Sequence, residues 1–313
     1  MATTTSPDRV LDLIEAYRRS KTMFTAVELG LFERQPQTDA EHRLADACVS
    51  LGLLKRDASG RYINSDDADK YLKRDSPDTM TGYIDYSNRV LYRLWGDLEG
   101  AVRENKNRWG TDGILFSNFY ATDESMKTFL MGMHGFGRMS SEAVVSAFDL
   151  SRFQRLVDLG GGTGHLPMAA KQRYPQLSSA VFDLPRVIGF ARTIASDIDF
   201  LEGDFFTDPL PQADLYALGR ILHDWSEDKI RALLAKIVAA LPKGGGLLVA
   251  ERLLDDDKGG PVTAHMQSLS MLICTEGRER TVAEYESLLR DAGFSSVSAK
   301  RTGTPMDAIL AVK

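Results

Sequence analysis

The chain has 313 residues, of which 43% are hydrophobic and 26% charged, the usage of an ordinary globular protein with a sizeable core. Its formal net charge of −6, with no cluster of Lys and Arg, disfavours a nucleic-acid partner. The chain has two cysteines (Cys48, Cys274), no apolar run of the ~18 residues that a membrane span needs and no signal-peptide pattern, so we expect a cytoplasmic protein that binds neither membrane nor metal.

Residues 1–100 show helical periodicity followed by a hairpin signal. Apolar residues recur at three- and four-residue steps, as in Val10, Leu13 and Ile14, and Ser59-Gly60 separates two short strand-like runs. Helix, helix and hairpin together outline a winged helix. Such modules often bind DNA, but acidic and basic residues are mixed here. We therefore favour a dimerisation role and expect a homodimer.

Residues 101–150 are expected to form connecting helices that line the substrate pocket. Methionine and phenylalanine are frequent in "DESMKTFLMGMHGFGRMSSEAVVSAF" and could simply be core residues. Gly132, Gly135 and Gly137 favour a pocket wall, because a helical glycine lets a ligand approach the backbone closely.

Short apolar runs alternate with helical patterns over residues 151–313, which predicts a doubly wound, Rossmann-like α/β sheet. The last two runs, "SSVSAKR" and "DAILAVK", are separated by only "TGTPM", which is too short for a crossover helix. These two runs are therefore expected to form an antiparallel hairpin at one end of an otherwise parallel sheet.

The strongest local signal is "LVDLGGGTGHL", where an apolar strand reaches Asp158 and Gly160, Gly162 and Gly164 precede a helix. Glycines at such a turn let backbone N–H groups approach a ligand at the helix N-terminus. A dinucleotide fingerprint needs a small residue where this chain has His165. The spacing G-x-G-x-G suits S-adenosylmethionine (SAM), which has no pyrophosphate. By itself, the loop could also be a plain glycine turn.

Acidic residues follow the next two strands. Asp183 in "VFDLP" could accept hydrogen bonds from ribose hydroxyls, and Asp204 with Phe205 in "GDFF" could hold and cover an adenine. A helix cap before Pro185 and an ordinary loop aspartate are the alternatives for the two acids. Because all these features fall at consecutive strand ends, a cofactor site is favoured.

Three titratable residues are expected at the same edge of the sheet. His223 follows the fourth strand, Glu251 ends the fifth and Glu279 precedes a helix. Ligands of a doubly wound sheet bind outside the carboxyl ends of its strands, so the three side chains would converge as a general base with orienting partners. His223 could instead be a buried histidine bonded to a carbonyl. Ser226 is expected to be an N-cap, and Asp224 is either a cap or an acid on the cofactor side.

This set of residues suits methyl transfer to a hydroxyl group. A phenol of pKa ~10 can give its proton to a histidine of pKa ~6.5 once the pair is desolvated. The opposite charges of phenolate and sulfonium vanish in the product, so a dry pocket favours the reaction. The sequence therefore favours a SAM-dependent O-methyltransferase that acts on a small aromatic acceptor. S-adenosylhomocysteine would be the product of the cofactor.

The motifs resemble the class I small-molecule O-methyltransferases of plants and animals, most of all the acetylserotonin O-methyltransferase branch and its "like" paralogues. The resemblance covers nearly all of the chain and is densest in "LVDLGGGTG", "VFDLP", "GDFFTDPLPQADLYALGRILHDW", "TEGRERT" and "DAILAVK". It implies a winged-helix-like dimerisation domain, a seven-stranded methyltransferase domain and no metal. It also implies His223 as the base, with Glu251 and Glu279 as its partners.

The loop, the strand ends and the resemblance together assign residues to the two ligands. The expected cofactor residues are Tyr120, Asp158, Gly160, Gly162, Gly164, Asp183, Leu184, Gly203, Asp204, Phe205 and Arg220. The residues expected near the acceptor are Met133, Phe136, Asp224, Met266, Ser270 and Met271.

Three features depart from the acetylserotonin branch. Ser270 stands where that branch has an asparagine that helps to hold the indole, and Gly137 stands where it has a tryptophan that stacks on the cofactor. The stretch between the first helix and "LGLL" is also shorter than in the family. From the residues alone, a carbon or nitrogen acceptor and a non-catalytic SAM-binding regulator stay open as alternatives. The break at His165 counts against a nicotinamide oxidoreductase.

Overall fold

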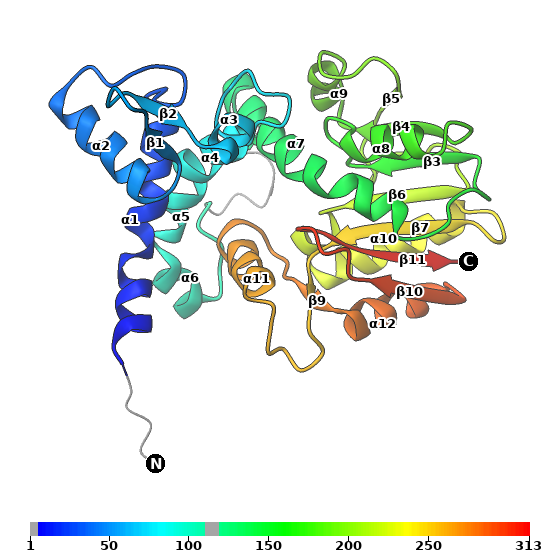
Figure 1. Cartoon of the computed structure of the whole chain (residues 1–313). Coiled ribbons are helices and arrows are strands. Elements are labelled where there is room, and N and C mark those ends of the chain that lie inside the picture. The colour runs from blue at the N-terminus through cyan, green and yellow to red at the C-terminus, as the bar shows by residue number, and fades with distance from the viewer. Residues whose placement is uncertain (1–5, 110–118) are drawn as a thin grey trace. The chain divides into compact units, whose positions relative to one another are not determined.

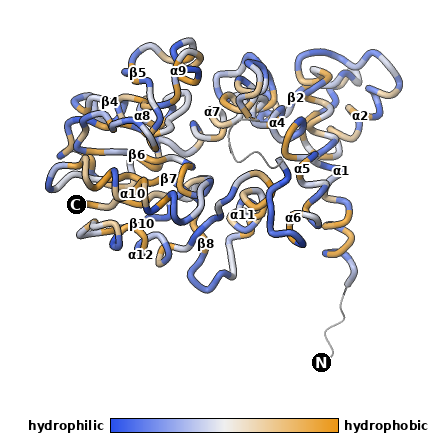
Figure 2. The backbone as a smooth tube through the Cα atoms, turned by 180° about the vertical axis from the view of Figure 1, so that it is seen from behind, coloured by the Kyte–Doolittle hydropathy of each residue, from blue (hydrophilic) through white to orange (hydrophobic). Residues whose placement is uncertain are grey.

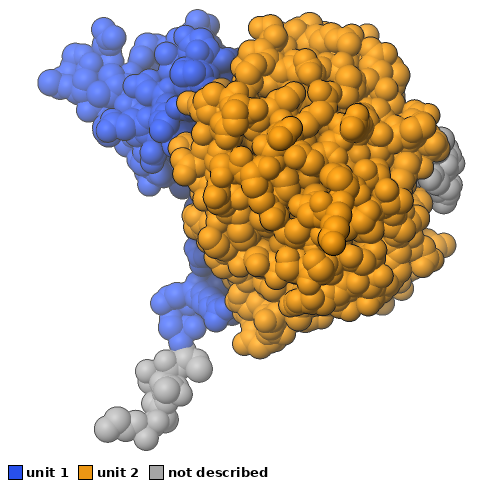
Figure 3. All heavy atoms as spheres, turned by 90° about the vertical axis from the view of Figure 1, so that its right-hand side faces the viewer, with its two compact units in different colours: residues 1–90 blue, residues 91–313 orange. Residues whose placement is uncertain are grey.

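The structure is a computed structural model that describes residues 6–109 and 119–313. These residues form two units, 1–90 and 91–313, which Figure 3 colours separately. The predicted division at residues 100 and 150 stays a prediction. Among the described helices, none is long and apolar enough to cross a membrane.

In the first unit, two helices are followed by a two-stranded hairpin, in the order that the sequence predicts (Figure 1). Thr38 caps the second helix by accepting a hydrogen bond from the backbone of Glu41, and Gly60 takes a φ of +81° in the hairpin turn. Residues such as Val27 and Leu54 form its core. The elements are α1 (Asp8–Glu28), α2 (Asp39–Ser50), β1 (Leu54–Arg56), β2 (Tyr62–Asn64), α3 (Asp66–Tyr71) and α4 (Thr81–Tyr86).

A π-helical turn, η1 (Ser87–Leu91), leads into the second unit, which is built around a seven-stranded sheet in the order β10-β11-β7-β6-β3-β4-β5. The five strands from β7 to β5 are parallel, and β11 and β10 are antiparallel, which confirms the expected terminal hairpin. The strands of this sheet are β3 (Arg155–Leu159), β4 (Ser178–Asp183), β5 (Asp199–Glu202), β6 (Leu215–Gly219), β7 (Gly246–Glu251), β10 (Ser296–Lys300) and β11 (Asp307–Val312).

Helices cover both faces of this sheet, which is why its central strands are apolar almost throughout (Figure 2). On one face, Val157, Leu218 and Val249 pack with residues of α10 and α12 in the main core. On the other face, α8 lies against β3 and β4, α9 lies against β4 and β5, and α7 packs on α8 (Figure 1). The helices of this unit are α5 (Tyr92–Trp95), α6 (Leu98–Glu104), α7 (Asp123–Ser146), α8 (His165–Arg173), α9 (Pro185–Ala191), α10 (Glu227–Ala240), α11 (Val262–Cys274) and α12 (Val282–Ala292).

The arrangement brings the carboxyl ends of five parallel strands to one edge. The glycine loop follows β3, Asp183 ends β4 and Glu251 ends β7. A short 3₁₀ turn, η2 (Leu222–Asp224), follows β6. A small parallel pair, β8 (Leu253–Leu254) with β9 (Arg280–Thr281), brings the segment before α12 alongside the end of β7. Residues far apart in the chain therefore meet at this edge.

Candidate active site

The glycine loop lies where the sequence predicts it, between β3 and α8. Gly160 and Gly164 have φ values of +72° and +82°, which a side chain would strain, and Gly164 is the N-cap residue of α8. The Gly162 N–H donates to Asp183 Oδ2 over 2.9 Å, so the loop is fastened to the end of β4. The helix N-terminus and the loop N–H groups form the kind of cradle that a polar ligand uses.

Two buried acids adjoin this loop. Asp158 is 2% exposed, and its Oδ1 has no hydrogen-bond partner among the described residues. Burial raises the pKa of Asp158 to about 8 and that of Asp183 to about 6. A buried acid without a partner is costly until a donor or a cation reaches it. A cationic ligand with an ammonium group, such as SAM, therefore fits the charge of this site.

The following acids are also placed at the strand ends. Asp183 is not a helix cap, since Leu184 takes the N-cap position of α9. The Oδ1 atom of Asp183 accepts the Leu184 N–H over 2.7 Å. Gly203 N donates to the Asp183 carbonyl, and Asp204 Oδ1 accepts from the backbone of Phe206. Burial raises the pKa of Tyr120, and the charge of the nearby Asp183 carboxylate adds to this rise.

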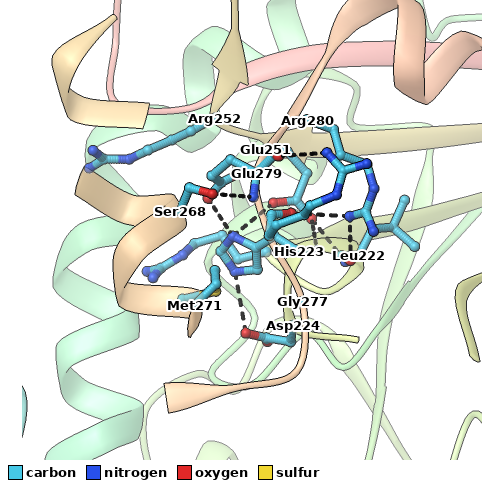
Figure 4. A network of polar contacts seen from close by, with 12 residues as sticks. Leu222, His223, Asp224, Glu251, Arg252, Ser268, Met271, Gly277, Glu279 and Arg280 are labelled. Atoms are coloured by element: carbon cyan, nitrogen blue, oxygen red, sulfur yellow. Dashed lines mark hydrogen bonds and ion pairs between the residues drawn. The ribbon is translucent and has the colours of Figure 1, made fainter. Parts of the chain in front are cut away.

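His223 lies in η2 and is 2% exposed, with both predicted glutamates beside it (Figure 4). Its Nδ1 is 2.7 Å from Glu279 Oε1 and 3.3 Å from Glu251 Oε2. Glu251 has a second role, because its Oε1 accepts hydrogen bonds from three consecutive backbone N–H groups of residues 221–223, at 3.1, 2.9 and 3.3 Å. One carboxylate therefore holds the turn that carries the imidazole, and the other holds its ring.

The other ring nitrogen, His223 Nε2, lies 3.6 Å from Asp224 Oδ1. Asp224 is buried in η2 and is not a helix cap, and burial raises its pKa to about 6. Ser226 takes the N-cap position of α10, as expected, but its side chain makes no capping hydrogen bond. The Nδ1 side of the imidazole is thus taken by carboxylates, whereas Nε2 has no partner within hydrogen-bond distance among the described residues.

Three arginines lie close enough to Glu279 for their charges to act on it, and the sequence analysis missed two of them, Arg252 and Arg280. Burial raises the pKa values of Glu251 and Glu279, and the charges of Arg220, Arg252 and Arg280 oppose that rise for Glu279. Arg280 is 2% exposed, and its guanidinium donates to the carbonyl of Leu222 in η2. Arg252 and Arg280 each directly follow one of the glutamates in the sequence, which was the available signal.

A close backbone contact was also missed. A Cβ at Gly277 would lie 2.1 Å from the carbonyl oxygen of His223, so only glycine lets the loop before β9 approach η2 this closely (Figure 4). The N–H of Glu276 donates to the Asp224 carbonyl over 3.3 Å. This approach brings Glu279 to the imidazole.

The structure brings some of the residues expected near the acceptor close to one another. The guanidiniums of Arg220 and Arg252 lie 4.7 and 5.0 Å from the ring centroid of Phe136, and Arg220 Nη1 lies 3.0 Å from the sulfur of Met133. Ser270 is buried, and its hydroxyl accepts a hydrogen bond from the indole of Trp95 over 3.2 Å. The remaining two are Met271, which is buried beside η2 in Figure 4, and Met266, which is 44% exposed.

His223, Glu251 and Glu279 are also the group, among the described residues, whose ligand atoms lie within 4.8 Å of one another in the manner of a metal site. A metal held by all three residues would be bound to Nδ1, the nitrogen nearest both carboxylates. Without a metal, Nδ1 can carry a proton instead. The site without metal stays a prediction.

Comparison with known proteins identifies the family. The family model described as "O-methyltransferase domain" matches residues 95–295. The chain is 42% identical to bovine acetylserotonin O-methyltransferase over 94% of each chain, and 36% identical to 3-hydroxy-5-methyl-1-naphthoate 3-O-methyltransferase of Streptomyces sahachiroi over 96% of this chain and 92% of that one. The crystal structure of human N-acetylserotonin methyltransferase in complex with SAM has a TM-score of 0.94 and 37% identity, covering 100% of this chain and 99% of that one. The chain therefore belongs to the SAM-dependent O-methyltransferases, in the family that includes the acetylserotonin enzymes.

Proposed function

We propose that this enzyme methylates the hydroxyl group of a small aromatic acceptor and that His223 is its general base. The observation that carries the proposal is the 2.7 Å contact between His223 Nδ1 and Glu279 Oε1 in a buried setting. A carboxylate on one ring nitrogen fixes the tautomer and leaves the other nitrogen to take a proton.

In this mechanism Nδ1 of His223 keeps its proton and forms a hydrogen bond with Glu279, while Nε2 takes the proton of the acceptor hydroxyl. Bound SAM would supply the methyl group from its sulfonium, and the neutral thioether S-adenosylhomocysteine would be the leaving group. Glu251 keeps η2 in place through its three backbone hydrogen bonds, and the imidazolium formed on proton transfer is stabilised by both carboxylates. Burial of the group excludes water and strengthens these interactions.

The cofactor is proposed to lie along the loop and the acidic strand ends. Support for this comes from Asp158 Oδ1, which has no hydrogen-bond partner within residues 6–109 and 119–313, from the hydrogen bond between Gly162 and Asp183, and from the position of Asp204. Among the residues that resemblance assigned to the acceptor, Phe136 and Met271 are buried and apolar, as a flat aromatic requires. The bovine and Streptomyces relatives are named for acceptors with a hydroxyl on an aromatic ring, which favours oxygen over carbon or nitrogen as the atom methylated.

The test is transfer of a labelled methyl group from SAM to a panel of phenols, hydroxyindoles, hydroxynaphthoates and amines. We expect turnover of a hydroxylated aromatic in the wild type and a loss of at least 100-fold in His223→Ala. His265→Ala is the control, since His265 is a partly exposed histidine of α11 whose Nε2 lies 2.9 Å from the Lys258 carbonyl, away from the carboxylates around His223. Equal rates in His223→Ala and wild type would contradict the base assignment. Methylation of amines alone would contradict the acceptor class.

We also propose that the protein works in the cytoplasm as a homodimer formed through its winged-helix-like N-terminal unit. Large apolar side chains of α1 are 52 to 67% exposed within the single chain, an unusual density for one helix. They are Val10, Leu11, Leu13, Ile14 and Tyr17. Light scattering after size exclusion should give twice the mass of one chain, and the double variant Leu13→Glu with Ile14→Glu should give the mass of one chain.

Both cysteines are free and buried, which suits the proposed cytoplasmic location because the cytoplasm is a reducing compartment.

A further inference from the structure

Helix α7 meets the glycine loop through two histidines that the mechanism does not use. His134 Nδ1, on α7, lies 2.8 Å from Thr163 Oγ1 in the loop. His165 Nδ1, at the start of α8, lies 2.9 Å from Ser141 Oγ on α7. Thr163 and Ser141 are 2% and 4% exposed, so these are buried polar contacts that need partners. They flank Gly164, where the chain turns from loop to helix.

The second contact defines the protonation of His165. The Ser141 hydroxyl donates its single proton to the Gly137 carbonyl over 2.8 Å. It can therefore only accept from His165, so the proton of the neutral ring lies on Nδ1. Burial lowers the pKa of His165 to about 3 and that of His134 to about 4. Both rings stay neutral beside a loop that receives a cationic cofactor.

The imidazole of His165 lies against the backbone of α7 at Gly137. A Cβ at Gly137 would stand 2.3 Å from both Cε1 and Nε2 of that ring, so any side chain there must displace the ring. Gly162, the residue before Thr163, donates its N–H to Asp183 of β4. The loop is thus held from the sheet by one acid and from α7 by two imidazoles.

We propose that His134 and His165 are positioning residues for the cofactor, and that Gly137 is the position on α7 that makes room for His165. They hold Thr163 and the start of α8 at a fixed separation from α7, so that the loop is preorganised for SAM before SAM binds. This inference rests on SAM as the methyl donor and adds residues that hold its loop.

The test measures SAM affinity by calorimetry and initial rates with both substrates varied, in Thr163→Val, Ser141→Ala and His165→Ala. Thr163→Val and His165→Ala each remove one hydrogen bond between α7 and the loop region, and Ser141→Ala removes that of His165 together with its own bond to the Gly137 carbonyl. Each change frees the loop, so we expect Kd and KM for SAM to rise about tenfold. The KM for the acceptor and kcat at saturating SAM should stay within twofold. A merely structural role would lower Tm without this selective change in KM.

Ser140→Ala is the matched control, because Ser140 is the neighbouring buried serine of α7 and its hydroxyl has no partner among the described residues. It should leave the Kd for SAM unchanged. Gly137→Ala should raise that Kd in the wild type but not in the His165→Ala background, where the ring is gone. An unchanged Kd in folded Ser141→Ala and Thr163→Val would overturn the proposal. A wild type that fails to bind SAM would overturn the function itself. His223→Ala should bind SAM normally but lose activity, so it distinguishes a failure of the base assignment from a failure of the loop proposal.

Discussion

Replacing Glu279 with Gln tests the relation between the glutamate and the base most directly. The substitution keeps the shape of the side chain and replaces a carboxyl group 2.7 Å from His223 Nδ1. Burial raises the pKa of this carboxyl to about 8, and the imidazolium that forms in the reaction favours its ionised form. At an effective dielectric constant of about 20, Coulomb's law gives about 6 kcal/mol for an imidazolium with Glu279 and about 5 kcal/mol with Glu251 at 3.3 Å. Glu251 remains in the variant, and the amide oxygen can still accept from Nδ1. If these two interactions offset about half of the ~6 kcal/mol, the net loss in the transition state is about 3 kcal/mol, which lowers kcat by about 100-fold or somewhat more.

The assay is labelled methyl transfer at saturating SAM and acceptor, with SAM affinity measured by calorimetry. The Kd for SAM should stay within twofold, because the glutamate acts on the imidazole rather than on the glycine loop. Glu276→Gln is the control, since Glu276 lies three residues earlier in the same segment and pairs with Lys229 at the surface. A kcat for Glu279→Gln within threefold of the control would refute the argument that Glu279 stabilises the imidazolium.

Three further predictions concern single contacts. Gly277→Ala should lower kcat at least tenfold with SAM affinity unchanged, because its Cβ would push the Glu279 segment away from the His223 carbonyl; normal kcat would show that the segment moves freely. Because burial raises the pKa of Asp158 from 3.8 to about 8, the ligand-free fold loses stability as pH rises through that range. The Tm of ligand-free Asp158→Asn, which cannot ionise, should therefore fall less than that of the wild type between pH 5 and 8, while SAM binds it more weakly; parallel Tm curves would contradict this. Ser270→Ala should lower the free energy of unfolding by about 1 to 3 kcal/mol in urea titrations, since it leaves the partly buried Trp95 N–H unpaired, and an unchanged midpoint would mean that the indole finds another acceptor.

Much of the fold followed from local periodicity and simple topology. The alternation of apolar runs and helical patterns predicted the parallel sheet, and the short "TGTPM" connection predicted the antiparallel pair β10 and β11. Because parallel strands end at one edge, His223 and Glu251 could be placed together from their positions after two strands. The identity of these residues and their positions at the carboxyl ends of strands were sufficient for that step.

Contacts between backbone segments distant in sequence could not be predicted in the same way. The packing of Gly277 against η2 joins segments more than 50 residues apart, and a loop glycine can equally serve a tight turn with no close neighbour. The sequence analysis assigned Asp183 to a ribose, whereas in the structure its two oxygens also accept the N–H groups of Gly162 and Leu184. His165 was noticed only because it broke a dinucleotide motif. Its contact with Ser141 depends on how α7 packs on α8, which periodicity does not specify.

The different bonding of the two glutamates has a practical consequence for capturing this enzyme with both of its ligands bound. Glu251 holds three backbone N–H groups, so its replacement leaves orphaned donors in the segment that carries the base and would distort the very complex under study. Glu279 contacts the imidazole from a separate segment, and its amide would fill the same volume. A slow Gln variant at 279 is therefore the better choice for crystallising an unreacted ternary complex, whereas a variant at 251 would report on a rearranged turn.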